Sequence, residues 1–367
     1  MQAEQQTNHS SHSPDGQPKR PSRAWQYAGL SVMAVMVGLT AWNLFDPEDN
    51  PLPALRGANG WFLLLGLLFV LFGIVCEGWT MQLLLRPMGR KIRFGRAFTY
   101  ANNDYYFSAV TPASLGGDPF TVYYMYKDGI EIAKSWVMFL SLMIVYTAAL
   151  VSLGVAAALL FPAAVFDSRT AVWVLFLVGA VVNLLFITIS AFLLFSKKLV
   201  RRAGYALIRL GARTRILKHP ERNTEKFDRS MEDYKAGARY MRSNFWLLFR
   251  IFIICIVQRL VLMMVTWCVY RSFGLTGVSF LEITALQAIV NMSVSVLPLP
   301  GGVGPAEQMF FWLFAGIFWD KLMPGLILSR GIAFYFTLIF SGIVTLSNHI
   351  AVKRRELQLR KGEKLHE

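Results

Sequence analysis

A ten-residue segment, Pro298-Leu-Pro-Gly-Gly-Val-Gly-Pro-Ala-Glu307, interrupts an apolar region of the chain and ends in an acid. Proline removes a backbone N–H donor and glycine relaxes the backbone, so no continuous helix can run through this segment. Inside a membrane, non-helical backbone survives only where protein or a water-filled cavity covers it. The segment therefore predicts a cavity, provided that the surrounding chain lies in a membrane.

The composition places the chain in a membrane. Of its 367 residues, 55% are hydrophobic and 16% are charged, and the mean hydropathy is +0.44. Apolar runs long enough to cross a bilayer recur, and these indicate transmembrane helices. We predict an all-α, polytopic integral membrane protein. Because the three cysteines and five histidines show no ligand or disulfide spacing, and no nucleotide motif occurs, we expect no metal and no cofactor.

A second broken segment, Thr111-Pro-Ala-Ser-Leu-Gly-Gly-Asp-Pro119, resembles the first at an offset of 186 residues. Both prolines and one glycine of each segment align without gaps, together with two flanking residues: Phe280 with Phe94, Val296 with Val110, Pro298 with Pro112, Gly302 with Gly116 and Pro305 with Pro119. We predict an internal repeat. Two unrelated Gly/Pro turns are the alternative.

The apolar runs define an order of elements. We expect a disordered tail over 1–24, a membrane half over 25–195, a basic segment over 196–245, a second membrane half over 246–350 and a basic tail over 351–367. Six full spans are predicted, at 25–45, 61–85, 135–161, 171–195, 245–270 and 324–350. The broken elements, 94–126 and 280–319, have arms shorter than the ~20 residues needed to cross, which favours re-entrant hairpins. Full crossings, giving eight or more helices, are the alternative.

Basic residues orient this topology. With the N-terminus in the cytoplasm, thirty Lys and Arg fall on the cytoplasmic side, against four outside: Arg56, Arg169, Arg271 and Lys321. This positive-inside bias accounts for the net charge of +15, so we expect no nucleic-acid partner. Segment 196–245 alone carries 14 Lys and Arg. It is either an ordinary cytoplasmic loop or a helix attracted to anionic headgroups.

The same orientation makes the two copies inverted. The span before the first hairpin runs inward, whereas the span before the second runs outward. Inverted repeats with discontinuous helices that meet near the midplane are a recurring plan of secondary transporters. We therefore expect the two hairpins to face each other around one site.

The broken segments also resemble a known family. The stretches Asn102–Pro119 and Tyr123–Gly129 look like the first signature of the lysylphosphatidylglycerol synthase transmembrane-region family, and Pro298–Glu307 looks like its second. The similarity spans roughly 25–350. It implies a flippase-like membrane region in the cytoplasmic membrane of a prokaryote. In the family, that region moves aminoacylated phosphatidylglycerol between leaflets, and relatives occur beside glycosyltransferase or hopanoid functions, which leaves the lipid open.

The chain differs from the family in two ways that limit which family functions we expect of it. The full-length synthase carries a soluble aminoacyl-transferase domain after its membrane part, whereas this chain ends about 17 residues after its last predicted span. Lysyl transfer is therefore not expected. Many members also carry Arg where this chain has Thr121, so this position does not predict a phosphate contact.

Charged residues inside the spans are the candidates for function, because each costs ~2.5–3.5 kcal/mol on insertion scales. Arg259, near the middle of its span, suits a lipid phosphate, with an ion pair to Glu77, Asp118 or Glu307 as the alternative. The last two acids begin half-helices, where they either cap the helix or contact a headgroup, an ion or a proton. The tyrosines around Tyr105 are expected to pack.

The positions expected to contact a lipid come from the two broken segments and the spans beside them: Glu77, Asn103, Asp104, Thr111, Pro112, Gly116, Gly117, Asp118, Arg259, Asn291, Pro300, Gly301, Gly302, Gly304, Glu307 and Arg330, the last with snorkelling to the outer surface as its alternative. Together these features predict a flippase-like transporter that moves an anionic or modified lipid (aminoacylated, glycosylated or polyprenyl-type) by alternating access. The alternatives are a membrane-embedded enzyme, or a docking partner for a lipid-modifying synthase or glycosyltransferase. A homodimer stays open.

Overall fold

The computed structural model describes residues 56–363 except 90, 112–115, 167, 214–219, 296 and 298–303. Over this part the chain is helical, with no strand, as expected for an all-α membrane protein. The helices are α3 (Gly60–Leu85), η1 (Arg86–Met88), α4 (Phe94–Val110), α5 (Gly117–Lys127), α6 (Ile132–Leu160), α7 (Pro162–Phe166), α8 (Thr170–Phe195), α9 (Lys197–Arg213), α10 (Pro220–Ser243), α11 (Phe245–Ser272), α12 (Phe280–Val294), α13 (Pro305–Phe318), η4 (Trp319–Lys321), α14 (Leu322–Arg330), the π-helix η5 (Gly331–Phe336) and α15 (Thr337–Glu363). The expected tail 1–24, the first span 25–45 and the site positions Pro112, Pro300, Gly301 and Gly302 lie outside the described residues.

Five stretches of the described chain are long and apolar enough to cross a membrane. Four are α3 with η1, α6, α8 and α11, and each lies within three residues of the predicted bounds. The fifth, Pro305–Arg355, is not one straight helix. Trp319, with a φ of 50°, separates α13 from η4, so the last span consists of α14, η5 and α15.

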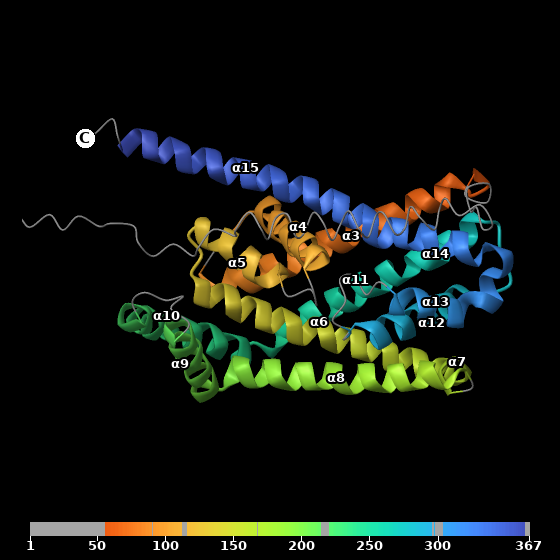
Figure 1. Cartoon of the computed structure of the whole chain (residues 1–367), viewed down its shortest axis with the longest axis horizontal. Coiled ribbons are helices and arrows are strands. Elements are labelled where there is room, and N and C mark those ends of the chain that lie inside the picture. Colours follow the sequence, from red (N-terminus) through yellow and green to blue (C-terminus); the bar gives the residue numbers. More distant parts are fainter. Residues whose placement is uncertain are drawn as a thin grey trace, which may run out of the picture.

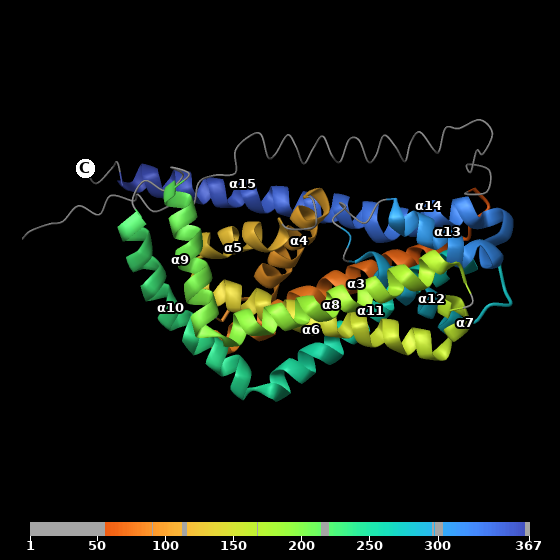
Figure 2. The ribbon, with the colours of Figure 1, turned by 60° about the horizontal axis from the view of Figure 1, so that its bottom comes forward.

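The two broken elements form hairpins at opposite ends of the bundle (Figures 1 and 2). α3 ends and α6 begins at the end where α9 and α10 lie, so α4 and α5 enter and leave there. α12 and α13 occupy the other half. At 1.5 Å per residue, α4 covers about 26 Å and α5 about 17 Å, and neither crosses and continues. The geometry is that of two re-entrant hairpins.

The halves are inverted copies. α3 and α11 pack along their lengths and run in opposite directions (Figure 1). α4 begins at Phe94 and α12 begins at Phe280, which reproduces the offset of 186 found in the sequence. The span that follows each hairpin packs against the hairpin of the other half: α6 packs against α12, and α15 packs against α4. Each broken helix is thus covered by a span of the other half.

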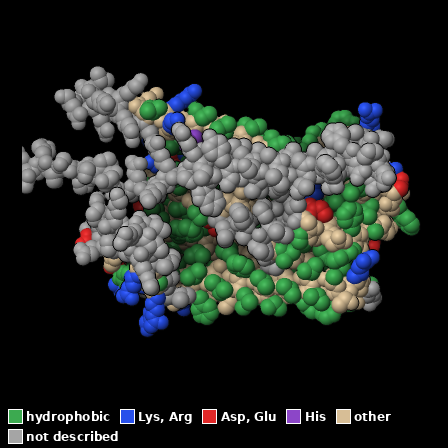
Figure 3. Space-filling view, viewed as in Figure 1, with side chains coloured by type: hydrophobic (Ala, Val, Ile, Leu, Met, Phe, Trp, Pro, Cys, Tyr) green, Lys and Arg blue, Asp and Glu red, His purple; other side chains and the backbone are tan. Residues whose placement is uncertain are grey.

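Two hydrophobic clusters fill the bundle. One surrounds α12, α13 and the C-terminal part of α11, and the other surrounds α4, α5 and the start of α6. Glycines permit close approach at α12, where Gly154 of α6 and Gly179 of α8 lie against Met292. On the visible face, hydrophobic side chains cover the surface between two ends that carry the Lys and Arg (Figure 3). Such an apolar band is what lipid contact requires.

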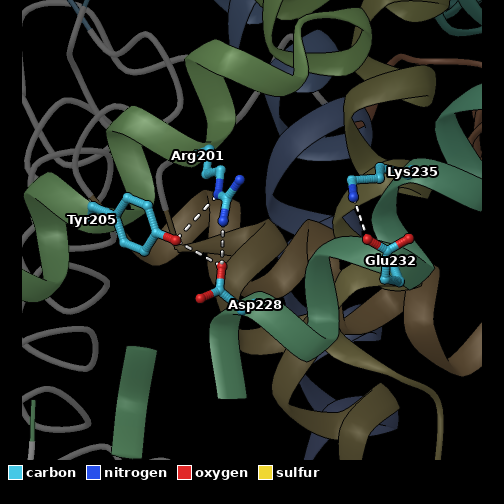
Figure 4. Close-up of polar contacts among 5 residues, drawn as sticks. All are labelled: Arg201, Tyr205, Asp228, Glu232 and Lys235. Carbon is cyan, nitrogen blue, oxygen red and sulfur yellow. Dashed lines mark hydrogen bonds and ion pairs between the residues drawn. The ribbon is translucent and has the colours of Figure 1, made fainter. Parts of the chain in front are cut away.

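Over its described residues, segment 196–245 folds as two helices, α9 and α10. Asp228 of α10 accepts a hydrogen bond from Tyr205 at 2.7 Å and faces Arg201 at 3.5 Å (Figure 4). The Tyr234 hydroxyl donates to the carbonyl of Leu193 at the end of α8, at 2.7 Å. These contacts join the helix pair to itself and to the bundle.

Candidate functional site

A polar cluster lies where α3, α4, α6 and α11 meet, and Glu77 of α3 is at its centre. Glu77 is only 6% exposed and accepts a hydrogen bond of 2.7 Å from Nε2 of Gln258 on α11. The same nitrogen lies 3.1 Å from the carbonyl of Gly73 and 3.1 Å from the Tyr105 hydroxyl. Gln258 therefore joins both inverted halves and the first broken helix.

Two further carboxylates flank this centre from the first hairpin. Asp104 of α4 lies against the backbone of α5, because a Cβ added to Gly117 would sit 2.3 Å from its Oδ1. Asp118 follows in the first turn of α5, where the helix dipole favours an acid. Both carboxylates interact electrostatically with Glu77. Within the described chain, Oδ1 of Asp104 is buried without a hydrogen-bond partner.

Arg259 supplies the cation of this cluster. It occupies the middle of α11, and its guanidinium carbon lies 3.6 Å from the centroid of the Tyr146 ring on α6. Its charge also acts on Glu77, but it forms no ion pair with the carboxylates that the structure describes, and its buried Nε has no hydrogen-bond partner there. The internal ion pair considered from the sequence is thus not formed. A stacked guanidinium with unused donors is suited to an oxyanion.

Fully buried polar side chains continue the cluster into the first hairpin. Asn103 is 0% exposed, and neither of its amide atoms has a partner among the residues described. Thr121 is also 0% exposed with an unpartnered hydroxyl. Unsatisfied buried groups cost about 1–3 kcal/mol each, so their number in one region points to a ligand or water.

The Thr111 hydroxyl joins the end of α4 to the start of α5. The Thr111 hydroxyl donates to the carbonyl of Phe107 at 2.6 Å and accepts from the backbone N–H of Gly116 at 2.9 Å. A Cβ at position 116 would lie 2.4 Å from the Thr111 methyl, so glycine is needed there. These predicted positions shape the hairpin next to Asp118.

The second hairpin carries a separate charge pair. Glu307, in the first turn of α13, accepts a hydrogen bond from the backbone N–H of Gly304 and pairs with Arg330 at 3.0 Å. Arg330 ends α14 and directly precedes the π-helix η5, a kind of irregularity that is frequent at functional sites. Arg330 therefore ties the last span to the start of α13. Asn291 joins neither the cluster around Glu77 nor the Glu307–Arg330 pair: its side-chain Oδ1 accepts a hydrogen bond from Gln287 on the same helix, at 3.0 Å.

The sequence located the charged residues of these groups and missed their partners. Tyr105 was expected only to pack, and Tyr146 and Gln258 were not among the predicted site residues. A glutamine next to an arginine in mid-span is a detectable signal for Gln258. The two tyrosines gave no such signal, because aromatic residues are ordinary in membrane helices.

The residues that the structure describes contain no group of three or more His, Cys, Asp or Glu placed to hold a metal ion. No curated protein sequence matches the chain. The family model described as "Lysylphosphatidylglycerol synthase TM region" matches residues 26–341, which include both broken segments. The chain belongs to the lysylphosphatidylglycerol synthase transmembrane-region family, a membrane family involved in lipid modification and flipping.

Proposed function

We propose that this protein moves a phosphate-bearing lipid between the two leaflets of the membrane. The observation that carries the proposal is Arg259, a mid-membrane guanidinium that is stacked on Tyr146 and has an unpartnered buried Nε. A half-buried guanidinium in mid-membrane that forms no ion pair within the described chain is costly, and a lipid phosphate would supply the missing charge and acceptors. The acyl chains would stay in the hydrocarbon region while the headgroup passes the cluster.

The inverted hairpins support movement by alternating access. The first hairpin enters from the end at which α9 and α10 lie, and the second enters from the opposite end (Figure 1). α3 and α11 form the long contact between the halves, and the polar cluster lies on that contact. Rocking of one half against the other would expose the cluster first to one side and then to the other. We assign Glu307 and Arg330 to the closure of the far side, because their pair ties α13 to the last span.

The test is transport by purified protein in liposomes that contain headgroup-labelled lipids of several classes. Loss of label from the inner leaflet, measured after a membrane-impermeant quencher is added, reports flipping. We expect protein-dependent flipping that Arg259→Ala abolishes and Arg250→Ala preserves, because Arg250 lies on the same helix but is exposed. No flipping across the panel would refute the proposal. A lipid recovered chemically altered would establish an enzyme instead, and co-purification of a synthase without flipping would establish a docking role.

A further inference from the structure

The polar cluster has a charge imbalance that arginine alone does not remove. Glu77 interacts electrostatically with Asp104 and Asp118 of the first hairpin and with the guanidinium of Arg259. Fully ionised, these four groups carry two excess negative charges in a region of low dielectric, where like charges repel strongly. A lipid phosphate would add a further negative charge. The proposed cargo can therefore enter only if at least one carboxylate takes up a proton.

Gln258 identifies Glu77 as the carboxylate whose protonation the protein can accommodate. The Nε2 of Gln258 faces three acceptors within 3.1 Å, although an amide nitrogen has only two N–H groups. Its Oε1 is buried, in a side chain that is 0% exposed, and has no partner within the described chain. If Glu77 is protonated, the amide can turn over, and Oε1 then accepts the new O–H. Both orientations satisfy the pair, so Gln258 fits both states of the acid.

The two states differ in how α3 is held against α11. With Glu77 ionised, Gln258 also donates to the backbone carbonyl of Gly73 on α3, at 3.1 Å. After the amide turns over, its oxygen faces that carbonyl, and the bond is lost because both atoms are acceptors. Gly73 is packed tightly, since a Cβ there would lie 2.9 Å from Leu262 of α11. Protonation therefore changes a contact on the interface between the two halves.

The other groups that face Glu77 do not replace it in this role. Those that act on its charge are Cys76 on α3, Asp104 and Tyr105 on α4, Asp118 on α5, Tyr146 on α6, and Cys255 and Arg259 on α11. Of the carboxylates among them, Asp104 and Asp118 lie on the first hairpin and form no hydrogen bond to the opposite half within the part of the chain that the structure describes. Of these three carboxylates, Glu77 is the one that is hydrogen-bonded to the opposite half, through Gln258 of α11.

We propose that Glu77 takes up one proton together with each lipid headgroup and releases it on the other side, so that the protein is a proton–lipid symporter. This inference rests on the proposed function, because it assigns the coupling ion of the same site. Proton uptake neutralises Glu77, admits the phosphate to Arg259, and releases the bond from Gln258 to Gly73. Proton release restores that bond.

The coupling makes a quantitative prediction. One proton moved with each lipid means that a pH difference of one unit, worth 1.36 kcal/mol, holds about a tenfold excess of lipid in one leaflet at steady state. For symport, the excess lies in the leaflet that faces the more alkaline compartment. An uncoupled protein would leave the lipid evenly distributed, however fast it flips.

The experiment uses the full chain in liposomes that carry a labelled phospholipid of a class shown to be flipped, with the membrane potential held at zero by valinomycin and equal potassium. The leaflet distribution is measured with and without a pH difference of about one unit. We expect about a tenfold excess for the wild type and for Glu232→Gln, an exposed carboxylate of α10 paired with Lys235. We expect an even distribution for Glu77→Gln, and proton uptake on lipid addition in detergent that this variant lacks.

The outcomes separate the coupling from the transport itself. Flipping with an even distribution in the wild type would overturn the symport and leave the proposed function intact, whereas no flipping would overturn the proposed function. An undiminished excess in Glu77→Gln would overturn the assignment to Glu77. If Glu77→Gln does not fold, the leaflet distribution of the wild type still shows whether lipid movement is coupled to protons. Gln258→Met, which removes the amide, then tests the link between the halves, and we expect it to lose the lipid excess as well.

Discussion

The packing of α12 against α8 predicts the effect of a single methyl group. An alanine at Gly179 would place its Cβ 2.3 Å from the backbone oxygen of Met292, whereas ordinary contact begins near 3.4 Å. α8 and α12 must therefore separate by about 1 Å. A carbonyl oxygen in a helix cannot swing aside, so the shift must be taken up by the helices.

The cost follows from what this separation disturbs. Overpacking of this kind costs about 1–3 kcal/mol. The shift also weakens the 2.9 Å hydrogen bond from Asn183 to Ser295, which is worth about 1 kcal/mol. Removing a helical glycine returns about 1 kcal/mol. We expect Gly179→Ala to destabilise the protein by about 1–3 kcal/mol.

A matched substitution separates backbone contact from general crowding. Alanine at Gly154 would also meet Met292, but the nearest atom, at 2.1 Å, is the sulfur of a flexible side chain. Its cost should be smaller, about 1 kcal/mol or less, because the thioether can change rotamer. Gly316→Ala, with open space around this position of α13, should stabilise the protein by up to about 1 kcal/mol through the loss of a helical glycine.

The assay is the midpoint of thermal unfolding in detergent, combined with the flipping rate. Gly179→Ala should lower the midpoint by several degrees and slow flipping, since α12 is an arm of the second hairpin. Equal midpoints for Gly179→Ala and Gly316→Ala would refute the reasoning from the α8–α12 contact.

Three further predictions concern charged and polar groups. In a double-mutant cycle on the free energy of unfolding, Glu307→Gln and Arg330→Gln should show a coupling energy of about 1 kcal/mol, because each side chain is about a quarter exposed. Additive effects would contradict a stabilising ion pair between the two residues. Arg259→Lys keeps the charge but loses the planar fork, so flipping should fall severalfold, and an unchanged rate would contradict bidentate phosphate binding. Burial raises the pKa of Tyr234 from 10.0 to about 12. The Tyr234 hydroxyl stabilises the protein by about 1 kcal/mol through its bond to Leu193, measured as the difference in free energy of unfolding between the wild type and Tyr234→Phe. This difference should be full below pH 10 and should decline as the pH rises to about 12. A difference that does not change with pH would contradict this expectation.

The repeat and the hairpins could be predicted from the sequence because proline and glycine act on the backbone at their own positions, whatever packs around them. Proline and glycine stop helices wherever they occur, so the arms could be placed from the positions of Pro298, Gly302 and Pro305 alone. The predicted span over 61–85 and the helix Gly60–Leu85 agree for a similar reason, since span length is set by bilayer thickness. In contrast, the pairing of α9 with α10 depends on contacts such as that of Tyr205 with Asp228, which join residues far apart in the segment 196–245.

The candidate site was less accessible to sequence reasoning. A charged residue in an apolar span is conspicuous, so Glu77 and Arg259 could be selected. Their partners depend on how helices rotate against one another, which composition does not specify. Hence the sequence left open an ion pair to Arg259 that the structure replaces with stacking on Tyr146, and it gave no reason to join Arg330 to Glu307.

In the proposed transport, two inverted halves move against each other along α3 and α11 to carry a lipid. The chain offers a direct way to stop that movement. A Cβ at Gly66 of α3 would lie 3.7 Å from the Cβ of the native Cys268 on α11, within the range of natural disulfides. Gly66→Cys should therefore cross-link the halves on oxidation.

Flipping by the reconstituted Gly66→Cys variant, measured before oxidation, after oxidation and after reduction, is the decisive measurement. The extent of cross-linking is read from protection of the thiols against alkylation, and the same variant with Cys268→Ser is the control. We expect oxidation to arrest flipping and reduction to restore it, and we expect the control to be insensitive to both. Unchanged flipping by fully cross-linked protein would contradict movement of the halves across this interface.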